Sequence, residues 1–476
     1  FLNFKMSIKS LGKNSLIYGL GHILARLVTF FLLPLYTHVF TPKEYGVISL
    51  AYAFMGFAMI FYRYGMDTAL MKFSVQNHGK ERTAYISTIY GFQVITSVLF
   101  SFVFFLSRNI IANTVLGDDR PEWIAILSVV MLLDVLWNLP VLLLRAEEKP
   151  IPFIIFNLIN VLSTMAFNII FVVFLKYGVW GVLLSNLFAS GILFVSTLPI
   201  IIKRISFKSI HSFTFNTVLK FAIPFLPAGI FTMIMELANR YLLSWMKGTL
   251  EVGLYSAGHK LGVFGLIVVM GFNMGWTPYF LKRGKQSGAR KEFSQAATLF
   301  LGLLGFVTIT VSLWVPEIMR LPLGSRTLIG NQFWSSGKVV SYILLAYFFF
   351  GTYVIQLPGI YMREKTNWIP VFRAIGAAVN IILNILLIPK YGVVGSAWAT
   401  VFAFMFMSLS IYIKNRNIYF VPYNWVAWIY PIVFMSFVFL AGSNFWVRIS
   451  ITIFYPVFWF LFVVNEEEKK VIKSLI

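Results

Sequence analysis

Charged side chains lie inside apolar stretches of the chain that are long enough to cross a bilayer. Arg26 lies near the middle of an apolar run over residues 15–40. Arg63 and Asp67 lie inside the next run, over residues 45–73. Crossing a bilayer takes roughly 20 apolar residues of helix, and an ionised side chain at the centre costs about 2.5–3.5 kcal/mol, so such residues face protein or water. The first two runs therefore predict one wall of a polar chamber inside a membrane.

Polar residues on these two runs, and on two later ones, recur at steps of three and four, which places them on one face of a helix. The later runs cover residues 217–246 and 251–280, and Asp134 lies on a further run over residues 122–145. The polar faces contain Ser15, Tyr18, His22, Arg26 and Thr29; Ser49, Tyr52, Gly56, Arg63 and Asp67; Thr232, Glu236, Arg240 and Ser244; and Tyr255 and His259, with Ser256 and Lys260 beside them.

Cations outnumber acids on the four runs that we expect to line the chamber. The cations are Arg26, Arg63, Arg240 and Lys260, and the acids are Asp67 and Glu236. A net-positive cavity selects an anionic guest, and the guanidinium fork of arginine matches phosphate oxygens bidentately. We therefore predict that the four cations bind a diphosphate, whereas an exporter of cationic drugs would need a cavity of the opposite sign.

Several of these residues also have a purely structural interpretation. Arg63 with Asp67 is spaced as an ion pair within one helix, which would neutralise itself. Glu236 with Arg240 has the same spacing. Lys260 lies close enough to the end of its run for its ammonium group to reach the membrane interface.

Four residues are candidates for ion coupling or charge balance, and each keeps an alternative. His22 suits proton coupling and a hydrogen-bonded packing role equally well. Asp134 has no partner close in sequence, so it suits ion coupling and a hydrogen bond to another helix equally well. For Asp67 and Glu236, ion coupling competes with the ion pairs described above.

The composition is that of a helical integral membrane protein. Hydrophobic residues make up 59% of the chain and charged residues 12%, and the mean hydropathy is +0.81, whereas soluble domains average about 45–50% apolar and 25% charged residues. The apolar runs are continuous, unlike the alternating segments of membrane barrels. The net charge of +22 is explained by cationic cytoplasmic connectors rather than by nucleic-acid binding.

About fourteen apolar runs are separated by short connectors. They cover residues 15–40, 45–73, 83–106, 122–145, 151–175, 179–202, 217–246, 251–280, 293–315, 338–362, 367–388, 393–414, 424–442 and 446–464. Lysine and arginine concentrate in alternate connectors, and the bias predicts that both termini lie in the cytoplasm.

Three short motifs recur in the same order along the chain. The motif that begins at Glu44 recurs at Glu251, Asn138-Leu-Pro140 recurs as Gln356-Leu-Pro358, and Lys176-Tyr-Gly recurs as Lys390-Tyr-Gly, with shifts between 207 and 218 residues. Such periodicity indicates a structural repeat. We predict two six-helix bundles, residues 1–210 and 211–420, related by a pseudo-two-fold axis along the membrane normal, and an accessory helix pair with a cytoplasmic tail at 421–476.

Motifs for other chemistry are absent from the sequence. The chain contains no cysteine, which excludes disulfides and thiolate metal sites. The segment from Gly330 to Lys338 is two residues too long for a phosphate loop and lacks the following Ser or Thr. No zinc signature or nucleophile elbow is present. We therefore expect no cofactor, no metal and no enzymatic activity.

The stretch SLIYGLGHILARLVTFFLLPLYTHVFTPKEYGVISLA, the paired KYGVxG motifs and the two six-span halves with two extra spans resemble the polysaccharide transporter family. This family comprises the Wzx-type O-antigen and capsule flippases of the MOP superfamily, which also holds lipid II flippases and MATE drug exporters. The resemblance covers essentially the whole chain. Its most specific part is Thr41-Pro-Lys-Glu-Tyr-Gly46.

The resemblance implies a flippase that moves an undecaprenyl-diphosphate-linked oligosaccharide across the bacterial cytoplasmic membrane by alternating access. It implies coupling to H⁺ or Na⁺, contact with membrane lipids and cooperation with glycan polymerase machinery. Arginines on the first two spans are similar to those of lipid II flippases, which supports Arg26 and Arg63 as substrate ligands. Arg240 and Lys260 are matched only by the span on which they lie.

Two other functions compete with this interpretation. A MATE-like cation antiporter would use the same fold, but the MATE pattern expects an acidic residue in the first span, which has none. A polysaccharide polymerase or ligase would need a sizeable outer loop to hold a glycan acceptor, and every connector is short.

Overall fold

Helices make up almost all of the chain that the structure describes, which comprises residues 30–117, 119–209, 212–440, 442, 444–466 and 468–469. The computed structural model divides into two compact units, Phe1–Gly253 and Leu254–Ile476. The division of the sequence into two repeats and an accessory pair stays a prediction, and each unit is described by itself below.

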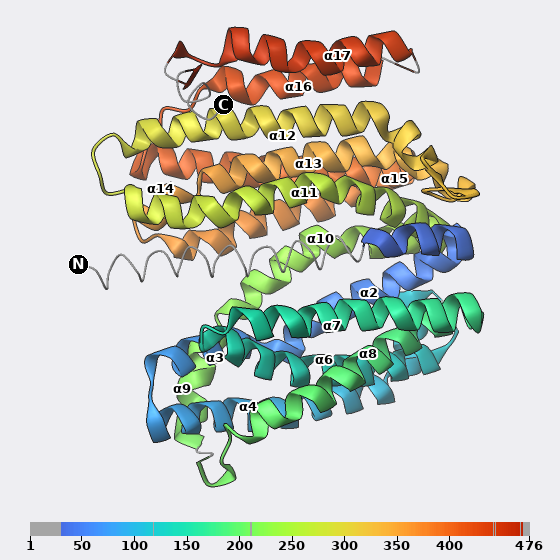
Figure 1. Cartoon of the computed structure of the whole chain (residues 1–476), viewed down its shortest axis with the longest axis vertical. Helices are drawn as coiled ribbons and strands as arrows, with labels where there is room; N and C mark the ends of the chain where they lie inside the picture. Colours follow the sequence, from blue (N-terminus) through green and yellow to red (C-terminus); the bar gives the residue numbers. More distant parts are fainter. Residues whose placement is uncertain are drawn as a thin grey trace. The chain divides into compact units, whose positions relative to one another are not determined.

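The described part of the first unit begins with a short helix, Phe30–Val39, and continues with long helices and short helical segments (Figure 1). They are α2 (Pro42–Arg63), α3 (Met66–Gln76), α4 (Gly79–Leu106), α5 (Arg108–Ile111), η1 (Ala112–Leu116), α6 (Pro121–Ala146), α7 (Pro150–Asn168), η2 (Ile169–Phe174), α8 (Gly178–Ile202), η3 (Phe207–Ser209), α9 (Ser212–Ala222) and α10 (Phe225–Lys247). Helix α6 packs along both α4 and α8, and α7 packs along α8.

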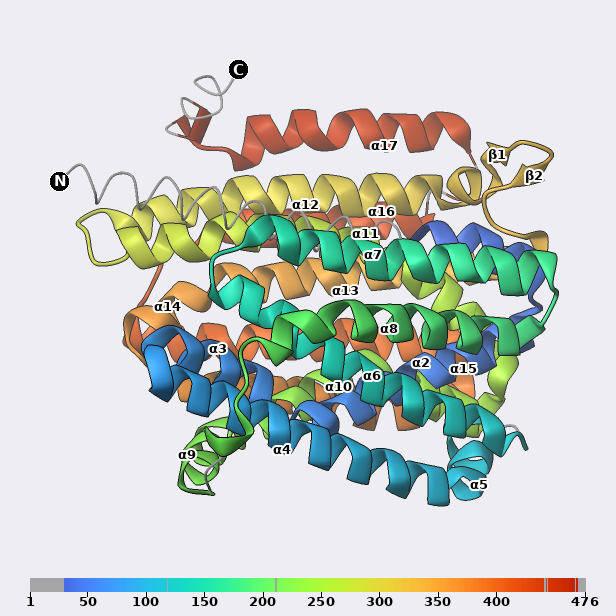
Figure 2. The same ribbon diagram turned by 60° about the horizontal axis from the view of Figure 1, so that its bottom comes forward.

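The second unit begins within α11 and ends with the last described helices. Its elements are α11 (Thr249–Arg283), α12 (Ala289–Arg320), β1 (Pro322–Leu323), β2 (Arg326–Thr327), η4 (Asn331–Ser336), α13 (Gly337–Ile355), α14 (Leu357–Met362), η5 (Thr366–Trp368), α15 (Ile369–Ile418), α16 (Trp425–Leu440), α17 (Phe445–Phe458) and η6 (Trp459–Val463). Strands β1 and β2 form an antiparallel hairpin after the end of α12 (Figure 2). Helices α16 and α17 pack on α12.

Within the described residues, 11 helices are long and apolar enough to cross a membrane. The predicted count of about fourteen is not confirmed by this number. The first predicted span lies mostly outside the described residues, and Trp425–Leu440 is a shorter apolar helix. The predicted spans 367–388 and 393–414 form the single element α15, which is broken only by the non-helical backbone of Gly392, with φ 54° and ψ −131°.

Both copies of the KYGVxG motif have a glycine at positive φ, but only the first copy also has a positive φ at its lysine, Lys176. In the first copy, Gly178 takes a positive φ of 58°, and in the second Gly392 does so with a φ of 54°. Three residues later, a Cβ on Gly181 would lie 2.9 Å from the carbonyl oxygen of Phe171, and a Cβ on Gly395 would lie 2.5 Å from that of Leu387. Each motif thus combines a left-handed turn with a close approach between the two arms of a helical hairpin, and glycine permits both.

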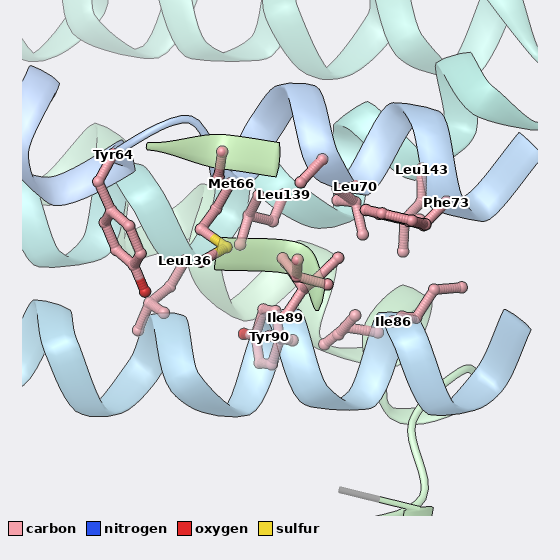
Figure 3. Close-up of a cluster of buried hydrophobic side chains, with 14 residues drawn as sticks. Tyr64, Met66, Leu70, Phe73, Ile86, Ile89, Tyr90, Leu136, Leu139 and Leu143 are labelled. Carbon is pink, nitrogen blue, oxygen red and sulfur yellow. The ribbon is translucent and has the colours of Figure 1, made fainter. Parts of the chain in front are cut away.

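A buried apolar cluster holds α3 and α9 of the first unit against α4 and α6 (Figure 3). Met66 and Leu70 of α3 pack with Ile89 of α4, Leu139 of α6 and Val218 of α9. Close packing of such side chains stabilises helix association through van der Waals contacts. This cluster fixes the position of α3, whose first turn carries one of the predicted site residues.

Candidate functional site

The motif Thr41-Pro-Lys-Glu-Tyr-Gly46 starts helix α2 by a local mechanism. The side chain of Thr41 accepts a hydrogen bond from the main-chain N–H of Glu44, and the carboxylate of Glu44 accepts one from the N–H of Thr41 at 2.9 Å. Pro42 occupies the first helical position, where its missing N–H costs nothing. The motif is a capping box that sets where α2 begins.

The sequence predicts a single helix over residues 45–73, but the structure has two helices there. Tyr64 has a φ of 29° and Gly65 a φ of 82°, so α2 ends at Arg63 and α3 begins at Met66. The break removes the helical register that an internal ion pair needs, and among the described residues no ion pair joins Arg63 to Asp67. Instead, Oδ1 of Asp67 accepts a hydrogen bond from the N–H of Thr68 at 2.8 Å.

Arg63 and Asp67 line the same cavity of about 240 Å³ within the first unit. Its walls come from α2, α3 and α10, and they consist of Gly56, Met59, Ile60, Arg63, Gly65, Asp67, Thr68, Phe225, Leu226, Gly229 and Met233. The Nε of Arg63 is buried and has no hydrogen-bond partner among the described residues. A buried donor without a partner costs free energy, so this guanidinium is available to an anion that enters the cavity.

Asp134 of α6 belongs to the same electrostatic neighbourhood, because its carboxylate interacts with the charge of Arg63. Its Oδ1 accepts hydrogen bonds from Oγ of Ser190 at 2.6 Å and from Nε1 of Trp137 at 3.0 Å. The hydrogen bond to another helix is therefore present. Trp137, three residues further along α6, is a sequence-local partner that the sequence analysis did not recognise.

Arg240 and Glu236 lie on α10, also in the first unit. The guanidinium of Arg240 donates a hydrogen bond to the main-chain carbonyl of Glu236 at 2.8 Å. Its charge also interacts with the phenolic hydroxyl of Tyr45. The side chain of Glu236 is exposed. Gly229 and Met233, earlier on the same helix, line the cavity with Arg63.

Lys260 lies on α11 in the second unit, where its side chain is half-buried. It follows His259, whose Nε2 lies 3.4 Å from the hydroxyl of Tyr347 on α13. Two further predicted site residues, Arg26 and His22, lie outside the described residues.

Sequence reasoning missed part of the surroundings of these charges. Asn186 and Ser190 of α8 are four residues apart and contact two predicted polar residues: Asn186 donates to the hydroxyl of Tyr52 at 2.9 Å, and Ser190 donates to Asp134. Their helical spacing within an apolar run was the available signal. The contribution of α10 to the cavity carried no such signal, because its lining residues there are glycine and apolar side chains.

A comparison with known proteins identifies the family of this chain. The family described as "Polysaccharide biosynthesis protein" matches residues 11–283, which is more than half of the chain. The chain belongs to this family. A further relative is an uncharacterized membrane protein of Haemophilus influenzae, 20% identical over 356 residues that cover 72% of this chain and 84% of the relative.

Two solved structures share the fold of this chain. The lipid II flippase MurJ in an inward closed conformation has a TM-score of 0.75 and 16% identity, covering 93% of this chain and 98% of MurJ. An inward-facing multidrug resistance MATE transporter of the MOP superfamily has a TM-score of 0.65 and 12% identity, covering 83% and 97%. The family member described here is therefore a multi-pass helical membrane protein with the fold of these transporters.

Proposed function

We propose that this protein is a flippase that carries an undecaprenyl-diphosphate-linked oligosaccharide across the bacterial cytoplasmic membrane. The observation that carries the proposal is the buried, unpartnered Nε of Arg63 at the wall of a cavity among apolar helices. The family description and the likeness to a lipid II flippase support the choice of a lipid-linked glycan. We propose further that both termini lie in the cytoplasm.

The chemistry of Arg63 suits a phosphate group. A guanidinium presents five N–H donors in a planar fork that matches two phosphate oxygens. Charge-assisted bonds of this kind are roughly twice as strong as neutral ones. The cavity of about 240 Å³ has room for a phosphate group rather than for a whole oligosaccharide. We therefore assign it to the phosphate end of the substrate, and we propose Arg26, Arg240 and Lys260 as further substrate ligands.

Ion coupling is proposed at Asp134, with Asp67, Glu236 and His22 as further candidates. Asp134 interacts with the charge of Arg63, so its protonation or its binding of Na⁺ changes the potential at the guanidinium. A phosphate bound to Arg63 and a proton or sodium ion bound to Asp134 would then favour each other. Loss of the ion from Asp134 would then weaken phosphate binding at Arg63, which is how an ion changes the affinity for the substrate.

A MATE-like cation antiporter is the second candidate, and one observation favours it. Two carboxylates, Asp67 and Asp134, lie in the neighbourhood of the cavity, and a multidrug MATE transporter shares the fold. Sensitivity of a host strain to cationic dyes, measured with and without the gene, distinguishes this candidate from a flippase.

The test of the flippase proposal is complementation of a strain that lacks this gene. We expect Arg63→Ala to abolish export of the surface glycan at near-normal protein abundance, because no other group replaces the fork. Arg63→Lys should retain part of the export, since it keeps the charge and loses bidentate geometry. The matched control is Arg108→Ala, at the first residue of α5 and outside the cavity, where the guanidinium contacts the carbonyl of Phe105. Full export by Arg63→Ala would contradict the proposal.

A further inference from the structure

A second cavity, of about 350 Å³, opens beside the C-terminal end of α12 in the second unit. It is separate in the sequence from every residue assigned above. Its lining comes from α12, η4 and the start of α13, and it consists of Ser312, Val315, Pro316, Met319, Arg320, Trp334, Gly337 and Lys338. Gly337 helps to keep it open, because a Cβ there would lie 3.1 Å from Sδ of Met319.

Two cations stand at this cavity without an acidic counterpart. Arg320 ends α12, and its guanidinium lies 4.5 Å from the ring centroid of Trp334. Lys338 lies in the first turn of α13. No ion pair of the described residues involves either cation. The nearest carboxylate along α12, Glu317, is bound by Nη1 of Arg448 at 2.6 Å, so the cavity keeps a net positive charge.

The inner part of the cavity combines apolar walls with one unsatisfied hydroxyl. Val315 and Met319 are buried and apolar. Ser312 is only 7% exposed, and its Oγ has no hydrogen-bond partner among the described residues. A buried hydroxyl without a partner is costly, and here it lies at the wall of a space that a ligand could fill.

Trp334 indicates the depth of this cavity in the membrane. Its Nε1 donates a hydrogen bond to the carbonyl of Ile329 at 3.0 Å, which holds the indole in place. Tryptophan gathers at the boundary between lipid tails and headgroups. The charge bias of the connectors predicts that this end of α12 faces outward.

We propose that this cavity binds an anionic phospholipid of the outer leaflet. The phosphate lies between Arg320 and Lys338, an ester carbonyl accepts the hydrogen bond of Ser312, and an acyl chain follows Val315 and Met319. Positive charge at the entrance and apolar surface behind it complement both parts of a phospholipid, whereas free phosphate would leave the apolar part empty. The site is independent of the proposed transport substrate.

The test is native mass spectrometry of the full chain in detergent with added dioleoyl-phosphatidylglycerol or dioleoyl-phosphatidylcholine. We expect phosphatidylglycerol to bind more tightly, and the double variant Arg320→Ala with Lys338→Ala to weaken its binding about tenfold or more. The matched control is Arg326→Ala with Lys390→Ala, which removes the same charges from exposed positions that do not line the cavity. This control should bind like wild type.

Further variants and a competition keep the outcome decisive. Lys338→Glu changes only an exposed side chain, so it should fold and should also lose binding. Ser312→Ala should weaken the binding of phosphatidylglycerol. The degree to which inorganic phosphate competes with the lipid should stay unchanged in this variant. Equal binding by wild type and the double variant would overturn the proposal. Inorganic phosphate that binds as tightly as phosphatidylglycerol would overturn it as well, because the site would then recognise the anion alone.

Discussion

Glu147 connects three helix ends of the first unit through one carboxylate. It lies directly after α6, and it pairs with Arg82 of α4 at 3.1 Å, with Arg204 after α8 at 2.7 Å and with Lys149 at 2.9 Å. The hydrogen bond from Arg204 is the main cause that lowers the pKa of Glu147 to about 2. The side chain is 13% exposed, so solvent screens these pairs less than it screens most surface ion pairs.

We predict that Glu147→Gln lowers the stability of the protein by on the order of 2 kcal/mol at neutral pH. The folded-state pKa lies below the usual value of 4.5. The stabilisation is therefore present at neutral pH and is lost as the pH falls from about 4.5 to about 2. Thermal unfolding in detergent between pH 7 and 3 should show the two proteins converging. Glu148→Gln, at the exposed neighbouring position, is the control and should behave like wild type at every pH.

Among single residues, Asp134 best shows what a sequence can and cannot reveal. Its presence inside an apolar run predicted a functional or hydrogen-bonded role. Its partner Ser190 is 56 residues away, and the contact exists only because α6 packs along α8. Ser and Thr are common in apolar helices, so the four-residue spacing of Asn186 and Ser190 alone does not identify Ser190 as the partner of Asp134.

At the scale of elements, the break between α2 and α3 is what places Arg63 and Asp67 on one cavity. Gly65 makes this break possible for two reasons. Its φ of 82° is costly for any residue with a side chain, and a Cβ there would collide with the carbonyl oxygen of Ala222 at the end of α9. The apolar cluster around Met66 and Leu70 then holds α3 against its neighbours (Figure 3).

We predict that Gly65→Ala destabilises the first unit and abolishes export together. Gly79→Ala is the matched control, because Gly79 also has a positive φ, 56°, but a Cβ there meets nothing within 4 Å. The control should lose only the conformational cost of about 1–2 kcal/mol, whereas Gly65→Ala also has to displace the main chain of α9. The unfolding temperatures of both variants in detergent measure the difference. Equal losses would show that the close approach to Ala222 does not matter.

At the scale of the whole molecule, the distribution of positive charge predicts the orientation in the membrane. The connector between α11 and α12 and the helix turns beside it are rich in cations, with Lys282, Arg283, Lys285, Arg290 and Lys291. The β1–β2 hairpin at the other end of α12 has Arg326. Because basic connectors stay in the cytoplasm, the two ends of this helix should lie on opposite sides of the membrane.

The absence of cysteine from the chain makes this orientation directly testable. We predict that Ser325→Cys, in the exposed hairpin turn, reacts with a membrane-impermeant maleimide in intact cells. Lys285→Cys, exposed in the α11–α12 connector, should react only after the membrane is permeabilised. The cysteine-free parent protein gives the background. The reversed pattern would invert the proposed topology and move the phospholipid site to the inner leaflet.

The sequence by itself determined the class of protein, the repeated motifs, the helical character and the buried charges. These are local properties: hydropathy, helical spacing and the backbone freedom of glycine act within one or two turns. The tertiary structure alone decided that Arg63 and Asp67 belong to different helices, that α10 completes their cavity, and that Arg320 and Lys338 meet beside Trp334. Such contacts depend on which faces of distant helices pack together, and apolar faces inside a membrane differ too little in sequence to specify their partners in advance.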